Sequence, residues 1–296
     1  MKPPPFTYFR PETLGEAIAL LGGTDNAKVL AGGQSLMAML NLRYVFPDAL
    51  IDINDLAELA GIAIGPERIR IGALTRQRRI ELDDALFDAM PIFRDAVKLV
   101  GHRQTRNRGT IGGSLCHLDP ASELPALALL LDAEIEAAGP QGTRRIPVRD
   151  FVAGYMMPGI APDEIVTAVE FARWAPTHGH AFHEFARRHG DFAVASAAVM
   201  LERGTDGAVT RCAIVIGGIG SVPQRHAAGE EHLTGRPADP QTIAAVIESC
   251  AELEVLGDFH GGADYRLSVA RTMLRRSLAL ALTRAAARMA PDRAAS

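Results

Sequence analysis

Two glycine-rich turns, about eighty residues apart, constrain this chain more than any other sequence feature. Residues 28–36 read KVLAGGQSL and residues 106–114 read RNRGTIGGS. Paired glycines carry no Cβ, so several backbone N–H groups can approach phosphate oxygens together. One such pair would indicate only a tight turn, whereas two indicate a diphosphate held between loops. A dinucleotide is therefore the leading ligand. Neither turn contains G-x-G-x-x-G, which disfavours a doubly wound nucleotide-binding domain.

The bulk composition bounds the class of protein. The chain has 296 residues, enough for two or three domains, with 48% hydrophobic and 22% charged residues. Its net charge is −4 and it has no long basic run, so we expect no nucleic-acid partner. The start lacks the apolar run of a signal peptide, and no stretch is long enough for a membrane span. We therefore expect a cytoplasmic protein.

The sequence predicts no metal site and no catalytic side chain. Cys116, Cys212 and Cys250 lie too far apart to ligate an iron–sulfur cluster. His178, His180 and His183 form an H-x-H-x-x-H cluster, but in a strand the third histidine would face away from the other two. No nucleophile–base pair or carboxylate dyad is apparent. The cluster of Arg103, Arg106 and Arg108 could contact phosphates or a partner, or simply be solvated.

The hydrophobic pattern predicts a small α/β unit over residues 1–56. Thr13 and Glu16 form a capping box for a helix that ends at Gly22-Gly23. A short strand at residues 28–31 then leads into the first glycine turn. A helix at 36–42 and a strand at 49–53 complete the unit.

A second α/β unit is predicted over residues 57–175. A hairpin turns at Gly65-Pro66, and helical sequence follows from about residue 75 to residue 100, interrupted near Pro91. The second glycine turn then leads into an apolar helix that begins near Pro125. Three further strands are expected, at residues 133–137, 144–148 and 165–171.

A C-terminal domain of antiparallel sheet plus helices is predicted over residues 176–290. Long strands at 192–203 and 209–217 are joined through Gly204-Thr205-Asp206-Gly207, a hairpin pattern. Helices are expected near 224–233, 241–253 and 263–289. Residues 291–296 are expected to form a flexible tail. The predicted fold class is therefore α+β.

Five motifs, in order, resemble the FAD-binding medium subunit of the carbon monoxide dehydrogenase and xanthine dehydrogenase family, the molybdenum hydroxylases. The resemblance spans nearly the whole chain and implies a PCMH-type FAD-binding fold of two α/β subdomains, followed by the C-terminal domain. The motifs are AGGQSL at 31–36 with Leu42-Arg43, QTRNRGTIGG at 104–113, DPASELP at 119–125, RRHGDFA at 187–193 and ADYR at 263–266.

The resemblance also implies which residues hold the cofactor. Residues 30–36 would wrap the FAD diphosphate and ribityl chain, and residues 110–114 would hold the diphosphate from the other side. Glu123 would bond a hydroxyl of the adenosine ribose, Val166 and His183 would lie near the isoalloxazine ring, and the loop with Asp191 and Phe192 would shield it. The implied FAD-binding residues are Leu30, Ala31, Gly32, Gly33, Gln34, Ser35, Leu36, Thr110, Ile111, Gly112, Gly113, Ser114, Glu123, Val166, His183 and Asp191.

Three of these positions depart from the family pattern. Ser114 stands where asparagine is usual, Glu123 where aspartate is usual, and His183 where some relatives have lysine. A histidine stabilises a reduced, anionic flavin only when it is protonated. The departures therefore bear on the flavin potential rather than on FAD binding.

By resemblance, the chain is an oxidoreductase subunit that binds FAD non-covalently. It would receive electrons from [2Fe–2S] clusters on a small partner chain, while a large partner carries the molybdenum cofactor, in a dimer of heterotrimers. The flavin performs the redox chemistry and the protein binds and tunes it. Two alternatives stay open: a stand-alone FAD oxidase or dehydrogenase, and a relative that has lost FAD and serves as a binding or assembly protein.

Overall fold

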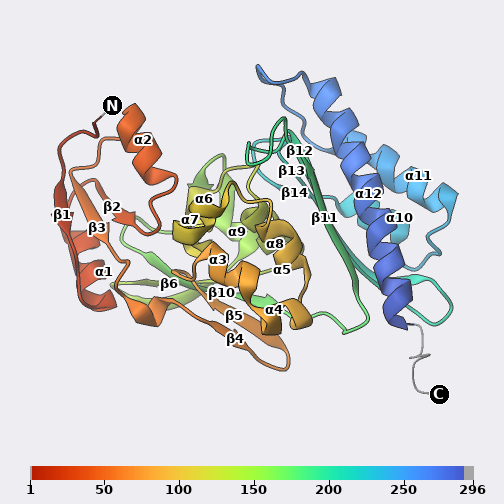
Figure 1. Ribbon diagram of the computed structural model, residues 1–296, viewed down its shortest axis with the longest axis horizontal. Helices are drawn as coiled ribbons and strands as arrows, with labels where there is room; N and C mark the ends of the chain where they lie inside the picture. Colours follow the sequence, from red (N-terminus) through yellow and green to blue (C-terminus); the bar gives the residue numbers. More distant parts are fainter. Residues whose placement is uncertain (1, 290–296) are drawn as a thin grey trace.

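The computed structural model describes residues 2–289, which form three units that follow one another along the chain (Figure 1). The first unit contains a three-stranded sheet, the second a five-stranded sheet, and the third a four-stranded sheet packed against a long helix. Helices and strands are thus mixed within each unit. The predicted α+β class is confirmed.

The N-terminal unit is a parallel sheet in the order β1-β3-β2. The capping box forms as predicted at its N-cap, since Thr13 Oγ1 accepts from the N–H of Glu16 at 3.1 Å. The Glu16 carboxylate, however, accepts from the N–H of Glu12 rather than from Thr13. The elements are β1 (Thr7–Phe9), α1 (Leu14–Gly23), β2 (Ala27–Leu30), α2 (Leu36–Leu42) and β3 (Ala49–Asp52).

The second unit is an antiparallel sheet in the order β4-β5-β10-β6-β7, with helices packed on one face. Alternation along β5 produces this arrangement: Ile69 and Ile71 are buried against the helices, whereas Arg68 and Arg70 pair with Glu134 and Glu136 on the other face. The strands are β4 (Ile62–Ile64), β5 (Arg68–Gly72), β6 (Glu134–Gly139), β7 (Gly142–Pro147), β8 (Val152–Gly154), β9 (Met157–Pro158) and β10 (Ile165–Ala172).

The helices of this unit are short. They are the 3-10 turn η1 (Ala57–Leu59) and the helices α3 (Gln77–Leu82), α4 (Asp84–Ala89), α5 (Ile92–Val97), α6 (Arg103–Arg108), α7 (Ile111–His117), α8 (Glu123–Leu130) and α9 (Val148–Phe151).

The C-terminal unit is an antiparallel sheet in the order β11-β12-β13-β14 that is covered on both faces. One face joins the core of the second unit through Phe182, Ala198 and Val215, and the other packs against the long helix α12 (Figure 1). Its elements are β11 (Gly179–Phe185), β12 (Ala195–Arg203), β13 (Val209–Gly217), β14 (Gln224–Arg225), α10 (Ala227–Leu233), α11 (Pro240–Glu248), η2 (Ser249–Glu252) and α12 (Ala263–Met289).

Several elements differ from the sequence-based expectation. The helical stretch expected at 75–100 is three separate helices, and α6 follows where only a turn was expected. The strand expected from residue 192 begins at Ala195, because residues 186–194 form a loop closed by Val194 N–H bonding to Phe185 O at 2.7 Å. Strands β1, β11 and β14 were not predicted. The expected tail at 291–296 lies outside the described residues.

Candidate cofactor site

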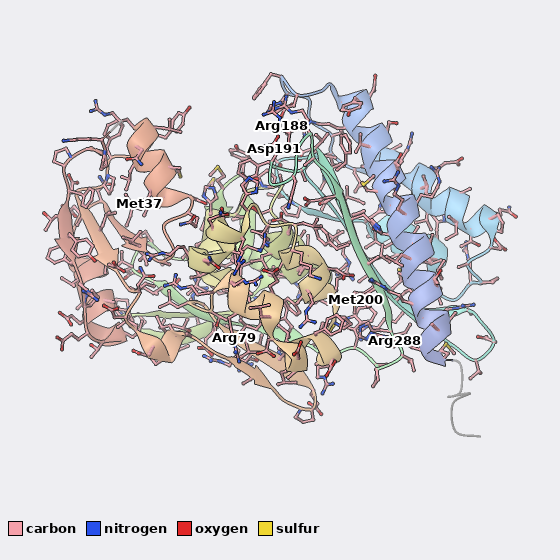
Figure 2. All side chains as sticks on the ribbon, in the orientation of Figure 1. Met37, Arg79, Arg188, Asp191, Met200 and Arg288 are labelled. Atoms are coloured by element: carbon pink, nitrogen blue, oxygen red, sulfur yellow. The ribbon has the colours of Figure 1, made fainter. Side chains whose placement is uncertain are left out.

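The two glycine turns face one cavity of about 830 Å³, which receives residues from all three units. That volume is within the usual range of small-molecule and cofactor sites. Figure 2 shows Asp191 and Arg188 on the loop between β11 and β12, on the side of the molecule that faces Met37 of α2. The sequence-predicted residues that line the cavity are Ala31, Gly32, Gly33, Gln34, Ser35, Leu36, Thr110, Gly112, Gly113, Ser114, Glu123, Val166 and Asp191.

Two of the glycines are required by the contact between chain segments rather than by a ligand. A Cβ on Gly32 would lie 2.2 Å from the carbonyl oxygen of Arg108, and one on Gly112 would lie 2.6 Å from Cβ of Ala73. The first turn therefore rests directly on the segment that leads into the second. Gly33 has a different reason, because its φ of +70° is a conformation that glycine adopts readily.

A hydrogen-bonded chain of two side chains joins the turns. Asn54 Nδ2 donates to the carbonyl of Ala31 at 2.7 Å, and Arg76 donates to Asn54 Oδ1 at 2.7 Å and to the carbonyl of Arg108 at 2.5 Å. Neither side chain was predicted from the sequence. The available signal was that Asn54 follows β3 at its carboxyl end, where ligand sites of parallel sheets gather.

The backbone N–H groups of the two turns are used differently. In the second turn, the N–H groups of Ile111, Gly112, Gly113 and Ser114 donate to Thr75 O, Ala73 O, Thr110 Oγ1 and Thr110 O. In the first turn, the N–H groups of residues 33–36 have no acceptor among residues 2–289. Unpaired N–H groups at the start of a helix attract an anion. The N–H groups that remain free to bind an anion at the cavity are thus those of the first turn.

One end of the cavity is closed by the loop that precedes β12. Gly190, Asp191 and Phe192 line the cavity, and the Phe192 side chain is 71% exposed. A Cβ on Gly190 would lie 2.5 Å from the imidazole of His102, whose ring meets that of His189 edge-on at 5.7 Å between centroids. Arg266 donates to Val194 O at 3.1 Å. These contacts fix the loop over the cavity.

The cavity wall also contains a carboxyl group whose proton affinity is high. Burial, followed by the charge of Glu184, raises the pKa of Glu123 to about 8. Glu123 therefore holds a proton at neutral pH, so it can donate a hydrogen bond as well as accept one. Lys28 is the cationic side chain of the first turn that lines the same cavity.

Three of the expected FAD-binding residues do not line the cavity. His183 faces α12, where its Nδ1 lies 3.0 Å from Ser277 Oγ, because alternation along β11 turns this side chain to the opposite face of the sheet from Glu184. His183 thus lies outside this cavity, and its expected place near a flavin ring stays a prediction. Ile111 is buried in the core of the second unit, and Leu30 belongs to β2 behind the turn.

One residue of the arginine cluster, Arg106, has a structural role. Arg106 is buried, pairs with Glu81 at 2.8 Å and donates to the carbonyls of Val100 and Gly101, two residues that line the cavity. Within residues 2–289, no three His, Cys, Asp or Glu side chains converge as metal ligands would. The helices described there include none with the length and hydrophobicity of a bilayer crossing.

The cavity lies between two glycine turns, one on an α/β unit and one on an antiparallel α+β unit, and a sheet backed by a helix follows along the chain. This arrangement defines a class of dinucleotide-binding protein outside the doubly wound folds. Two family models match the chain: the FAD binding domain in molybdopterin dehydrogenase over residues 4–174, and the CO dehydrogenase flavoprotein C-terminal domain over residues 180–281. The chain belongs to this family of FAD-binding subunits. The resemblance stated from the sequence is confirmed.

Individual relatives match over almost the full length. The chain is 40% identical to the 6-hydroxypseudooxynicotine dehydrogenase complex subunit alpha of Paenarthrobacter nicotinovorans, covering 96% of this chain and 97% of the relative. It is 34% identical to the carbon monoxide dehydrogenase medium chain of Hydrogenophaga pseudoflava, covering 97% and 100%. The expected assignment to the oxidoreductases is thereby confirmed.

Solved structures agree with this family. The fold matches carbon monoxide dehydrogenase from Hydrogenophaga pseudoflava with a TM-score of 0.93 and 35% identity, over 96% of this chain and 99% of the other. It matches quinoline 2-oxidoreductase from Pseudomonas putida 86 with a TM-score of 0.92 and 32% identity, over 96% and 99%. The predicted FAD-binding fold with its C-terminal domain is confirmed.

Proposed function

We propose that this chain binds FAD non-covalently in the cavity between its units and acts as the electron-exit subunit of a molybdenum hydroxylase. The observation that carries the proposal is the set of four unpaired N–H groups of residues 33–36, which open into a cofactor-sized cavity. The diphosphate would bind these groups and the N-terminus of α2. FAD, when bound, supplies the redox chemistry, and the protein holds and tunes it.

The family membership supports the finer assignment of partners. Electrons would arrive from [2Fe–2S] clusters on a small partner chain and leave to an external acceptor, while a large partner carries the molybdenum cofactor. The assembly would be a cytoplasmic dimer of heterotrimers. Within the chain we propose units at residues 1–56, 57–175 and 176–290, with FAD contacts from the cavity-lining residues named above.

Reconstitution tests the cofactor assignment. Purified chain mixed with FAD and then desalted is expected to keep stoichiometric flavin, visible as its absorbance. A colourless protein would overturn the proposal and favour the relative that has lost FAD. Turnover of a small substrate by the flavin-loaded chain alone would instead favour the stand-alone oxidase or dehydrogenase.

Co-expression tests the partners. We expect the chain to co-purify with a small chain carrying [2Fe–2S] clusters and a large molybdenum-cofactor chain encoded beside it. Substrate of the large chain should reduce the flavin only when the small chain is present. Flavin reduction in its absence would contradict the proposed electron route.

A further inference from the structure

Glu184 is a half-buried residue whose carboxylate the proposed FAD contacts do not use. It lies on β11, where His180, Phe182 and Glu184 share one face of the strand. Phe182 belongs to the core of the second unit, so this face of the sheet packs against that unit, which includes α8. Glu184 Oε2 is inaccessible to solvent and has no hydrogen-bond partner among the described residues.

The first turn of α8 is seated against the same part of the sheet. The N–H of Gly218 donates to the carbonyl of Pro120 at 2.8 Å. A Cβ on Gly217 would lie 2.6 Å from Ser196 Oγ and 3.5 Å from Pro120 O, and Ser196 is the register partner of Glu184 on β12. Glu123, the first residue of α8, lines the cavity, and it is near enough to Glu184 to feel its charge.

The surroundings of this pair favour neutral carboxyl groups. Burial raises the pKa of Glu184 to about 7, and burial with the charge of Glu184 raises that of Glu123 to about 8. Asp119 and Arg106 also face Glu123, and Arg106 is engaged by Glu81. Burial raises the pKa of the Cys116 thiol to about 12 and lowers that of His117, so both stay neutral from pH 7 to 9. The other charged side chains lining the cavity are Lys28, Glu164 and Asp191.

We propose that Glu184 is a positioning residue that keeps one proton on the Glu123–Glu184 pair while FAD occupies the cavity, so that the chain binds FAD together with a proton. This inference rests on the proposed function. Two ionised carboxylates near each other repel, and Arg106, a cation that acts on Glu123, is already paired with Glu81. An anionic diphosphate in the same cavity adds to that repulsion.

The affinity for FAD should therefore depend on pH. For wild-type apoprotein, we expect the Kd for FAD to rise by up to about tenfold per pH unit once the free pair loses its proton, over roughly pH 7 to 9. Glu184→Gln keeps the shape but replaces one carboxyl group with a neutral amide. This variant carries at most one negative charge at the pair, as the singly protonated wild-type pair does. Its Kd for FAD should therefore not change with pH over the same range.

Two further variants separate a proton effect from a structural one. Glu184→Asp retains a carboxyl group and should keep the pH dependence. Asp191→Asn removes a different cavity carboxylate, one that is exposed. Its Kd for FAD, divided by its own Kd at low pH, should rise with pH as steeply as that of the wild type. Titration calorimetry in buffers of different ionisation enthalpy should show proton uptake with FAD for wild type at the alkaline end, and none for Glu184→Gln. A wild-type slope that survives in Glu184→Gln, or a wild type without a slope, would overturn the proposal.

The pair can also be judged without FAD, in case the chain binds none. Because both folded-state pKa values lie above the ordinary value of 4.5, the pair's contribution to stability is lost as the pH rises through 7 and 8. Glu184→Gln should therefore raise the urea midpoint of the apoprotein more at the alkaline end than near pH 6. An equal change at both ends would overturn the shared proton. A failure of FAD binding alone would overturn only the proposed function.

Discussion

The partners of individual backbone N–H groups distinguish the two glycine turns. The two motifs are alike in sequence. The N–H groups of residues 111–114 donate to oxygens of Ala73, Thr75 and Thr110, whereas those of residues 33–36 have no acceptor among residues 2–289. An anion binds where donors are free and a helix begins. We therefore propose the first turn as the anchor of the diphosphate, with the second turn supporting it.

A charge placed at Gly33 should test this anchor. Asparagine tolerates the left-handed backbone found there, and the nearest contacts of an added Cβ are the flexible ends of Met37 and Leu30, at 3.2 and 3.3 Å. Aspartate has the same shape as asparagine but carries a negative charge, so Gly33→Asp places that charge beside the proposed diphosphate. We expect it to bind FAD at least about tenfold more weakly than Gly33→Asn does, by equilibrium titration. Equal affinities would place the diphosphate elsewhere.

Most of the residues predicted to bind the cofactor line the cavity, and the exceptions have physical reasons. Gly33, Ser35 and Ser114 stand in short contiguous motifs, so their role is local. Asn54 and Arg76 bond to partners distant in sequence, and the one local signal was the position of Asn54 at the carboxyl end of β3. His183 lies outside the cavity because the face of β11 that it occupies packs against α12.

Among the secondary-structure elements, α6 is held to α3 by an ion pair. Arg106 and Glu81 have side chains only 9% and 8% exposed. Glu81 also pairs with Arg78 at 2.8 Å, so the loss of Arg106 leaves its carboxylate only partly compensated. Arg106→Met should therefore lower the free energy of unfolding by about 2 kcal/mol in urea titrations. The exposed Arg103→Met, on the same helix, should change it by less than about 0.5 kcal/mol. Similar effects of the two variants would show that the pair is not structural.

The junction of β11 with α5 and α12 should be acid-sensitive. Burial lowers the pKa of His178 to about 4 and that of His180 to about 2, both below the ordinary 6.5. The unfolded chain therefore binds protons first, so stability falls as the pH drops from 6.5 toward 4, by about 1.4 kcal/mol per pH unit for each histidine. His180→Leu should make the urea midpoint less dependent on pH between 7 and 5. An unchanged dependence would contradict this origin of acid sensitivity.

The elements that the sequence did not predict depend on distant partners. Strand β1 has only three residues and exists because it pairs in parallel with β3. Strand β11 is recognisable only through its pairing with β12. The helices within residues 77–97 are separated at Asp83 and Met90-Pro91, and Asp83 caps the second of them through the N–H of Leu86 at 2.9 Å. Hairpins and the long helix α12 were predictable, because their signals are local.

In the whole molecule, the cavity exists only because three units meet. The first supplies free N–H donors, the second supplies the turn that supports them and the Glu123 carboxyl group, and the third supplies the closing loop with Asp191. The close contact of Gly32 with Arg108 and the Asn54–Arg76 link join the first two units at the cavity. Cofactor binding and the packing of the units are therefore coupled.

The structure of the FAD-loaded chain tests the central claim most directly. The account predicts that diphosphate oxygens lie within hydrogen-bonding distance, about 3 Å, of the N–H groups of residues 33–36, with those of residues 111–114 still bonded to protein oxygens. A diphosphate held by the second turn alone, or FAD bound outside this cavity, would contradict it.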